Sequence, residues 1–289
     1  MLETNVIYNE SCLDTCRRLP DESIDCVITS PPYWMLRDYG YDGQWGLEPT
    51  FNDYLEHLWS LMDELYRILK PEGTVWINLG DTYNTVSGGI KAKTQSINKN
   101  MNKSFIESNI YNKSKEIRNK CLLLIPHRFA IGAIDRGWIL RNDIVWGKRN
   151  GMPEGVTDRF TKKHEYMFFF TKNEKYYFGL DAVREKVDID SVKRELRGNR
   201  DNTKYGKDGY APLSKSNTLS SSRIYKGYSE LDAEMLSHKG KNPGDVSDFW
   251  DIPTKASRSS HYAVYNDELL RKPILAGCPE NGIIYDPFM

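Results

Sequence analysis

Two hydrophobic periods alternate along the chain, and each change of period marks an expected element of secondary structure. Residues 24–29 form a short run of β-favouring residues that ends in a turn at residues 30–32, which predicts a buried strand that delivers a loop. Across residues 51–69, apolar residues recur at steps of three and four, which predicts an amphipathic helix. Residues 74–79 predict a second strand. A strand, a helix and a strand in this order predict a βαβ unit, and therefore a mostly parallel sheet with helices on its faces.

Further strands are expected downstream, at residues 138–146, 166–170 and 282–286, and a helix is expected to begin at Pro126. No internal repeat accompanies these elements. Together with the βαβ unit, they predict a single three-layer α/β domain across residues 1–289.

Two polar stretches, residues 85–120 and residues 187–245, interrupt this succession of strands and helices and predict insertions between them. The net charge of the whole chain is zero, but the charges are segregated. Residues 85–120 hold eight basic and two acidic residues, and residues 193–226 hold nine basic and three acidic residues, so each tract carries a net charge of +6. The tracts are either solvated loops or segments that contact phosphate groups. For the second interpretation, the candidate contacts are Lys91, Lys93, Lys99, Lys103, Arg194, Arg197 and Arg200.

Composition and cysteine usage narrow the class of protein. The chain has no run of eighteen apolar residues, so we expect no membrane span, and its N-terminus lacks the basic start and apolar stretch of a secretion signal. The five cysteines form no Cys-x-x-Cys pair and their number is odd, which predicts reduced thiols in a cytoplasmic protein. His127 and His164 have no second ligand at metal spacing, so we expect no metal site.

The most informative motif, Ser30-Pro31-Pro32-Tyr33, follows the first expected strand. The hydroxyl of Ser30 and the backbone carbonyl of Pro31 are acceptors on a turn that two consecutive prolines hold rigid. Such acceptors are suited to bind the hydrogens of an aromatic amine and to free its lone pair, which is otherwise delocalised into the ring. The ring of Tyr33 offers a flat face on which a base can stack. Taken alone, the motif is also compatible with an ordinary loop.

The motif resembles the catalytic motif of the DNA amino-methyltransferases, in which Asp, Asn or Ser precedes Pro-Pro-Tyr. A second match lies at the far end, where Tyr285-Asp286-Pro287-Phe288 resembles the start of that family's methyl-donor loop. The catalytic motif precedes the donor motif, which is the circularly permuted order of the β-class of these enzymes. Residues 152–165 and 249–253 resemble the family's intervening segments, so the resemblance covers most of the chain outside the two insertions.

The resemblance implies a Rossmann-like methyltransferase fold and S-adenosyl-L-methionine as the methyl donor. The residues implied in catalysis are Ser30, Pro31, Pro32 and Tyr33. The residues implied in cofactor binding are Asp286, Pro287, Phe288, Tyr265 and His261. The expected substrate is an exocyclic amino group in double-stranded DNA, on a base that is flipped out of the duplex. Serine at the first catalytic position favours cytosine N4, and adenine N6 is the alternative.

The resemblance also implies an organisation and a partner. Residues 1–84 and 121–186 would form the catalytic region, and residues 249–289 would form the cofactor-binding segment. The two insertions, residues 85–120 and 187–245, would recognise the target DNA. A cognate restriction endonuclease is the further partner that the resemblance suggests.

The sequence departs from the family pattern at two places. Asn9-Glu10-Ser11-Cys12 stands where a Gly-Asp pair is usual, so that Ser11 replaces an acidic residue expected near the cofactor. The sequence ends at Met289, before the glycine-rich stretch that the donor motif leads us to expect, and we interpret it as a C-terminally truncated copy. A catalytically inactive DNA-binding remnant is the alternative function that this second departure leaves open.

Overall fold

The computed structural model describes residues 3–40, 42–84, 117–183, 247–255 and 266–288. The chain divides into two compact units, one formed by Met1–Gly179 with Asp248–Met289 and the other by Leu180–Ser247. The first unit holds the sheet and the helices that pack on it. The described part of the second unit contains the short helix α6 (Leu180–Val183). Most of the two predicted insertions lies outside the described residues.

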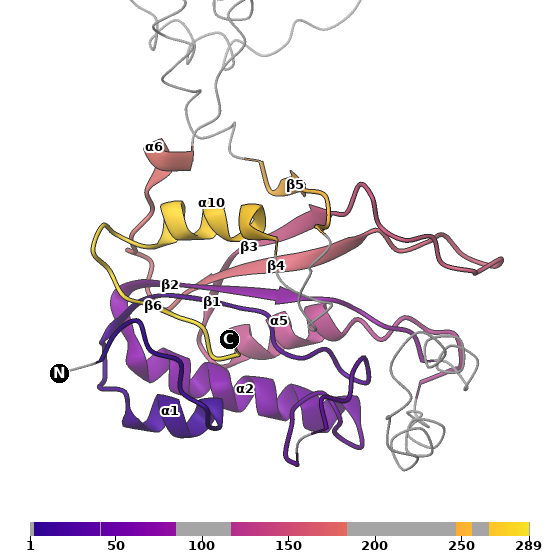
Figure 1. Ribbon diagram of the computed structural model, residues 1–289, viewed down its shortest axis with the longest axis horizontal. Coiled ribbons are helices and arrows are strands. Elements are labelled where there is room, and N and C mark those ends of the chain that lie inside the picture. Colours follow the sequence, from indigo (N-terminus) through magenta and orange to yellow (C-terminus); the bar gives the residue numbers. More distant parts are fainter. Residues whose placement is uncertain (1–2, 41, 85–116, 184–246, 256–265, 289) are drawn as a thin grey trace, which may run out of the picture. The chain divides into compact units, whose positions relative to one another are not determined.

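Among the described residues, six strands form one sheet in the order β5-β3-β4-β2-β1-β6 (Figure 1). Strand β1 pairs in parallel with both β2 and β6, and β3 pairs in parallel with β5. Strand β4 is antiparallel to both of its neighbours, so it runs against the other strands. The strands are β1 (Ile24–Thr29), β2 (Leu69–Leu79), β3 (Ile139–Gly147), β4 (His164–Thr171), β5 (Phe249–Asp251) and β6 (Ile284–Tyr285). The mostly parallel sheet of the predicted Rossmann-like α/β fold is thereby confirmed.

Helices cover both faces of the sheet and complete the three layers (Figure 1). One face carries α1 (Cys12–Arg18), α2 (Phe51–Ile68) and α5 (Ile125–Asp135), and the other carries α10 (Asp267–Gly277). None of the helices in the described ranges is long and apolar enough to cross a membrane.

Helix α2 confirms the expectation from the apolar spacing, and its N-terminus explains why it starts where it does. The hydroxyl of Thr50 accepts a hydrogen bond from the backbone N–H of Asp53 at 3.1 Å, and the carboxylate of Asp53 accepts one from the backbone N–H of Thr50 at 3.2 Å. This reciprocal pair satisfies two donors that the first turn of a helix leaves without partners. The strand expected at residues 74–79 begins earlier, at Leu69, directly after the helix.

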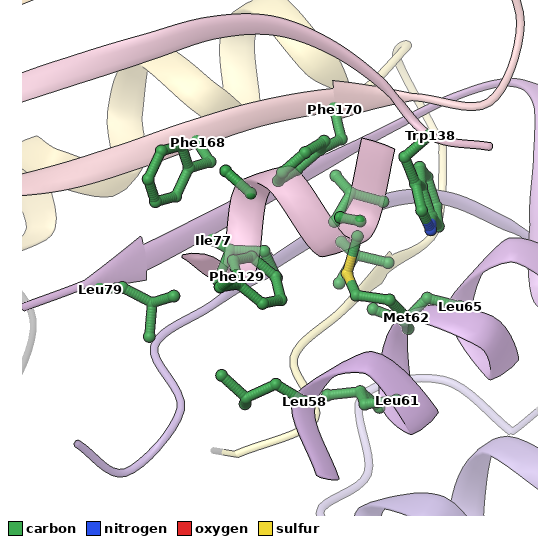
Figure 2. Close-up of a cluster of buried hydrophobic side chains, with 14 of the residues drawn as sticks. Leu58, Leu61, Met62, Leu65, Ile77, Leu79, Phe129, Trp138, Phe168 and Phe170 are labelled. Atoms are coloured by element: carbon green, nitrogen blue, oxygen red, sulfur yellow. The ribbon is translucent and has the colours of Figure 1, made fainter. Parts of the chain in front are cut away.

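The phenylalanines of β4 lie between the two layers of helices and point to both faces of the sheet. Phe168 and Phe170 lie on the α2–α5 side, where Phe129 of α5 contacts both rings (Figure 2). Phe169 points to the opposite face and stacks on Trp76 of β2 with 4.1 Å between the ring centroids. Because successive side chains of a strand point to opposite faces, three consecutive phenylalanines indicate a strand that is buried on both sides.

The contact between α2 and α5 depends on a residue without a side chain. The indole N–H of Trp59 donates to the carbonyl of Phe129 at 3.0 Å, which brings the indole ring against the backbone of α5. A Cβ atom at Gly132 would lie 2.2 Å from that ring. Glycine at this position therefore permits the two helices to pack closely.

We expect Gly132→Ala to lower the free energy of unfolding by about 1 to 3 kcal/mol, because the added methyl group overpacks the Trp59 contact. In an exposed helix the same change would raise stability by roughly 0.5 to 1 kcal/mol, so the sign of the effect is diagnostic. Urea unfolding measures the difference, with Gly155→Ala as the control, since a Cβ atom at Gly155 would meet no atom within 4 Å. An unchanged or increased stability of Gly132→Ala would contradict the close packing.

Candidate active site

The predicted catalytic and donor motifs lie at one edge of the sheet. The turn that starts at Ser30 follows β1, and the segment that starts at Asp286 follows β6, which is the parallel neighbour of β1. Residues Gly80 and Asp81 follow β2, the other parallel neighbour. Because parallel strands end at the same edge, all three loops are brought together where open α/β sheets bind their ligands.

A hydrogen bond joins the ends of β1 and β6. The hydroxyl of Thr29 donates to Oδ1 of Asp286 at 2.5 Å, and the backbone N–H of Phe288 donates to the same oxygen at 3.0 Å. Thr29 is fully buried. Burial raises the pKa of Asp286 above its ordinary value, and the two hydrogen bonds oppose that shift. The predicted donor motif is therefore fixed beside β1, the strand that leads into the predicted catalytic motif.

The same carboxylate suits the methyl donor that the sequence implies. The hydrogen bonds to Asp286 among the described residues go to Oδ1, so Oδ2 is available to a ligand. S-adenosylmethionine carries a sulfonium group and an ammonium group, and either positive charge would offset the cost of a buried carboxylate. The carboxylate of Asp286 is thus chemically suited to bind S-adenosylmethionine.

The Ser30 hydroxyl is oriented by a buried amide. Asn78 is 2% exposed, and its Nδ2 donates to the carbonyl of Tyr166 at 3.0 Å, which fixes Oδ1 as the atom that faces the turn. The hydroxyl of Ser30 donates to this Oδ1 at 3.4 Å, a long hydrogen bond. Because the proton of Ser30 is directed to Asn78, the lone pairs of its oxygen remain for an external N–H donor.

The Tyr33 ring is held by its hydroxyl. The hydroxyl donates to Oε2 of Glu165 at 2.7 Å, and it lies 3.0 Å from Oδ1 of Asn78. Its single proton can serve only one of these acceptors at a time, and the shorter contact is to the carboxylate. The other carboxylate oxygen of Glu165 is bound by the ammonium of Lys148. Side chains from β2 and β4, and from the residue directly after β3, thus set the position of this ring.

Two glycines allow the turn to pack against its neighbours. A Cβ atom at Gly80 would lie 2.5 Å from Cε2 of Tyr33, so the ring rests against bare backbone at the end of β2. Gly46 has a φ of +92°, and a Cβ atom there would lie 3.1 Å from the carbonyl oxygen of Tyr33 and 3.3 Å from Pro32. The backbone N–H of Met35 donates to the carbonyl of Gly46 at 2.7 Å. Gly80 thus allows close packing on the ring of Tyr33, and Gly46 allows close packing on the backbone of the turn.

The remaining predicted site residues lie either in the two motifs or outside the described part of the chain. Pro31 is buried within the turn, and the ring of Phe288 packs against Trp45 with 5.3 Å between the centroids. Pro287 lies between Asp286 and Phe288 in the donor motif. The following predicted residues lie outside the described part of the chain: Tyr265, His261, Lys91, Lys93, Lys99, Lys103, Arg194, Arg197 and Arg200. Among the described residues, no group of histidine, cysteine, aspartate and glutamate side chains could hold a metal ion.

Sequence reasoning did not assign roles to Asn78, Lys148 or Gly80, and for Glu165 it left open whether the residue shapes the base pocket or braces the sheet. Asn78 and Gly80 could have been considered, because both lie at the end of an expected strand and therefore at the edge where ligands bind. The contact of the Glu165 carboxylate with Tyr33 could not be predicted, because it depends on the antiparallel direction of β4.

A cavity of about 190 Å³ adjoins the site and shares Tyr166 with it. Its lining includes Asp81, Lys162 and His127, and the Nδ1 atom of His127 is buried without a hydrogen-bond partner. Burial raises the pKa of Asp81 and lowers the pKa of Lys162, because each charged form loses solvation. The edge of the sheet therefore offers a recess next to the turn that both polar and apolar side chains line.

The chain is similar to known DNA methyltransferases in sequence and in fold. The DNA methylase family N6_N4_Mtase matches residues 24–289. The Type II methyltransferase M.Cfr9I of Citrobacter freundii is 33% identical over 289 residues, which cover 99% of this chain and 78% of that protein. M.SmaI of Serratia marcescens is 33% identical over 270 residues, which cover 93% of this chain and 74% of that protein. The PvuII DNA methyltransferase (cytosine-N4-specific) has a similar fold, with a TM-score of 0.54 and 15% identity, over 96% of this chain and 72% of that structure.

We expect Gly80→Ala to displace the Tyr33 ring and to lower the single-turnover rate of methyl transfer by about 10- to 100-fold, the cost of an ångström-scale misplacement. The free energy of unfolding should also fall, by about 1 to 3 kcal/mol, because the added methyl group overpacks a ring that hydrogen bonds hold in place. Rapid-quench kinetics and urea unfolding measure the two quantities, and Gly155→Ala is the control. A variant that folds and reacts at the wild-type rate would show that the ring position does not matter.

Proposed function

The chain belongs to the N6_N4_Mtase family of DNA methylases, and from this premise we propose that it is a site-specific cytosine-N4 DNA methyltransferase. The methyl donor is S-adenosyl-L-methionine, whose sulfonium supplies an electrophilic methyl group. The acceptor in this proposal is the exocyclic amine of a cytosine that has been extruded from duplex DNA. The observation that carries the proposal is the Ser30 hydroxyl, whose proton is directed to Asn78.

The amine of cytosine is a poor nucleophile because its lone pair is delocalised into the ring. In the proposed complex, the lone pairs of the Ser30 hydroxyl and the carbonyl of Pro31 accept the two amine hydrogens, which localises the nitrogen lone pair. The hydrogen bond from Ser30 to Asn78 makes the hydroxyl oxygen a better acceptor, since linked hydrogen bonds polarise one another. These acceptors are in place before the substrate binds, so no reorganisation is needed as charge develops on nitrogen.

Tyr33 would provide the surface on which the extruded base stacks. Its hydroxyl contacts Glu165 and Asn78, and Gly80 leaves room for the ring, so its plane is set by the sheet. Asp286 and Phe288, linked to β1 through Thr29, would position the donor on the neighbouring side of the turn. Nitrogen and the methyl carbon would then approach in line, and positioning alone supplies much of the rate.

Cytosine is proposed over adenine because serine at the first catalytic position favours cytosine-N4 members of the family. The structural neighbour whose name states cytosine-N4 specificity is 15% identical and shows the fold alone, so the preference rests on Ser30. Adenine N6 is the second candidate acceptor, because it presents the same aromatic amine chemistry.

Binding to DNA would draw on the two basic tracts. Residues 85–120 and 193–226 each carry a net charge of +6, and we propose that they contact phosphates and recognise the target sequence. Relatives of the chain are named Type II methyltransferases, which supports a restriction endonuclease of the same specificity as a functional partner.

The test is the identity of the modified nucleoside. The intact protein is incubated with DNA and isotopically labelled donor, and the DNA is digested to nucleosides and analysed by mass spectrometry. We expect label in N4-methylcytosine. Label in N6-methyladenine would move the specificity to the second candidate, and DNA that is bound but unlabelled would indicate a DNA-binding protein without catalysis.

We expect Ser30→Ala to lower the single-turnover rate on the order of 100-fold or more, about 3 kcal/mol of barrier, by analogy with the loss of one polar group from an oxyanion hole. Affinity for DNA should be nearly unchanged, because the hydroxyl acts on the amine and not on the phosphates. Quench-flow kinetics and fluorescence anisotropy separate the two effects. Ser60→Ala, an exposed serine on α2, is the matched control. A wild-type rate in Ser30→Ala would remove this hydroxyl from the mechanism.

A further inference from the structure

One aromatic side chain stands out from the surface near the site. Phe160 is 96% exposed, more than any other large hydrophobic residue among those described. Single exposed hydrophobic residues are common on protein surfaces, so exposure alone does not indicate a contact. The setting of this residue, however, differs from that of a residue at the tip of a free loop.

The backbone on both sides of Phe160 is fixed to the sheet edge. The guanidinium of Arg159 donates to Glu154 at 2.6 Å and lies 4.0 Å from the ring centroid of Tyr83. On the other side, the ammonium of Lys162 donates to the backbone carbonyl of Asp81, directly beyond β2. The contacts of the neighbouring residues therefore fix the backbone that carries the exposed phenyl ring. The ring also lines the cavity beside the turn.

The surrounding segment is suited to a polyanion. Residues 148–163 hold five basic and two acidic residues, a net charge of +3, in a chain whose net charge is zero. The segment leads directly into β4, where Glu165 accepts the hydrogen bond from Tyr33. An exposed aromatic ring, a positive segment and the catalytic turn thus lie along one edge.

We propose that Phe160 enters the base stack of duplex DNA and occupies the space that the target base leaves when it is extruded. This inference rests on the proposed function, because only an enzyme that flips its target needs such a residue. Extrusion breaks stacking on both sides of the target, and an apolar side chain inserted between the neighbouring bases restores part of it. The basic residues of the 148–163 segment would hold the backbone of the same DNA.

The alternative role for Phe160 is direct stacking on the extruded base in the adjoining cavity. The two roles predict different responses to the partner of the target base. A wedge residue matters only while the target is paired, since its effect is to favour extrusion. A stacking residue matters for every substrate, because it contacts the base after extrusion.

The experiment compares two substrates and three variants of the intact protein. The recognition sequence is first mapped on plasmid DNA that the wild-type protein has methylated. Two duplex oligonucleotides then carry this sequence, one with the target base paired and one with the target opposite an abasic site. Single-turnover rates are measured for Phe160→Ala, Phe160→Leu and the control Met152→Ala, which alters an 84%-exposed residue of the same segment.

We expect Phe160→Ala to lose at least about tenfold in rate on the paired duplex and to stay within about twofold of wild type opposite the abasic site. Phe160→Leu should retain most of the paired-duplex rate, because a wedge needs apolar volume and not an aromatic face. Met152→Ala should resemble wild type on both substrates.

Two outcomes would overturn the proposal. An equal loss of rate for Phe160→Ala on both substrates would assign the ring to the extruded base or to the fold, and a wild-type rate on both would leave it without a role. Failure of the proposed function looks different, since the wild-type protein would then methylate neither duplex.

Discussion

The hydrogen bond from Thr29 to Asp286 is the contact on which the rest of the site depends. It links residues 257 positions apart and fixes the ends of two parallel strands, β1 and β6, at one edge of the sheet. Burial raises the pKa of Asp286, whereas the hydrogen bonds from Thr29 and Phe288 lower it and so favour the charged carboxylate. A cationic methyl donor would offset the free-energy cost of burying that charge.

The opposite side of the turn is built from strands of both directions. Asn78 comes from the carboxyl end of β2, whereas Glu165 comes from the amino end of β4, which runs the other way. The two side chains meet at the hydroxyl of Tyr33. The reversed strand therefore contributes to the site twice, because it delivers Glu165 and it receives the segment that carries Phe160. Packing, through Gly80 and Gly46, then sets how closely the turn approaches the sheet.

Local features of the sequence predicted much of this molecule. The apolar spacing of α2, the strand before Ser30 and the two motifs at the ends of β1 and β6 each depend only on a short stretch of the sequence. The start of β2 at Leu69, the direction of β4 and the contacts of Asn78 and Glu165 were not predictable, because each depends on pairing between strands distant in sequence. The predicted roles of Tyr265 and His261 stay predictions, since both residues lie outside the described part of the chain.

We propose that the predicted catalytic turn and the predicted donor segment form one site through Thr29. The most direct test measures the affinity for S-adenosylmethionine by calorimetric titration of the intact protein with Thr29→Val, which keeps the shape and removes the donor hydroxyl. If Thr29 joins the two parts of the site, S-adenosylmethionine should bind Thr29→Val at least about tenfold more weakly, because a hydrogen bond to a buried charge is lost, and should bind Thr29→Ser nearly normally. Equal affinity in Thr29→Val and wild type, with the fold intact, would contradict it.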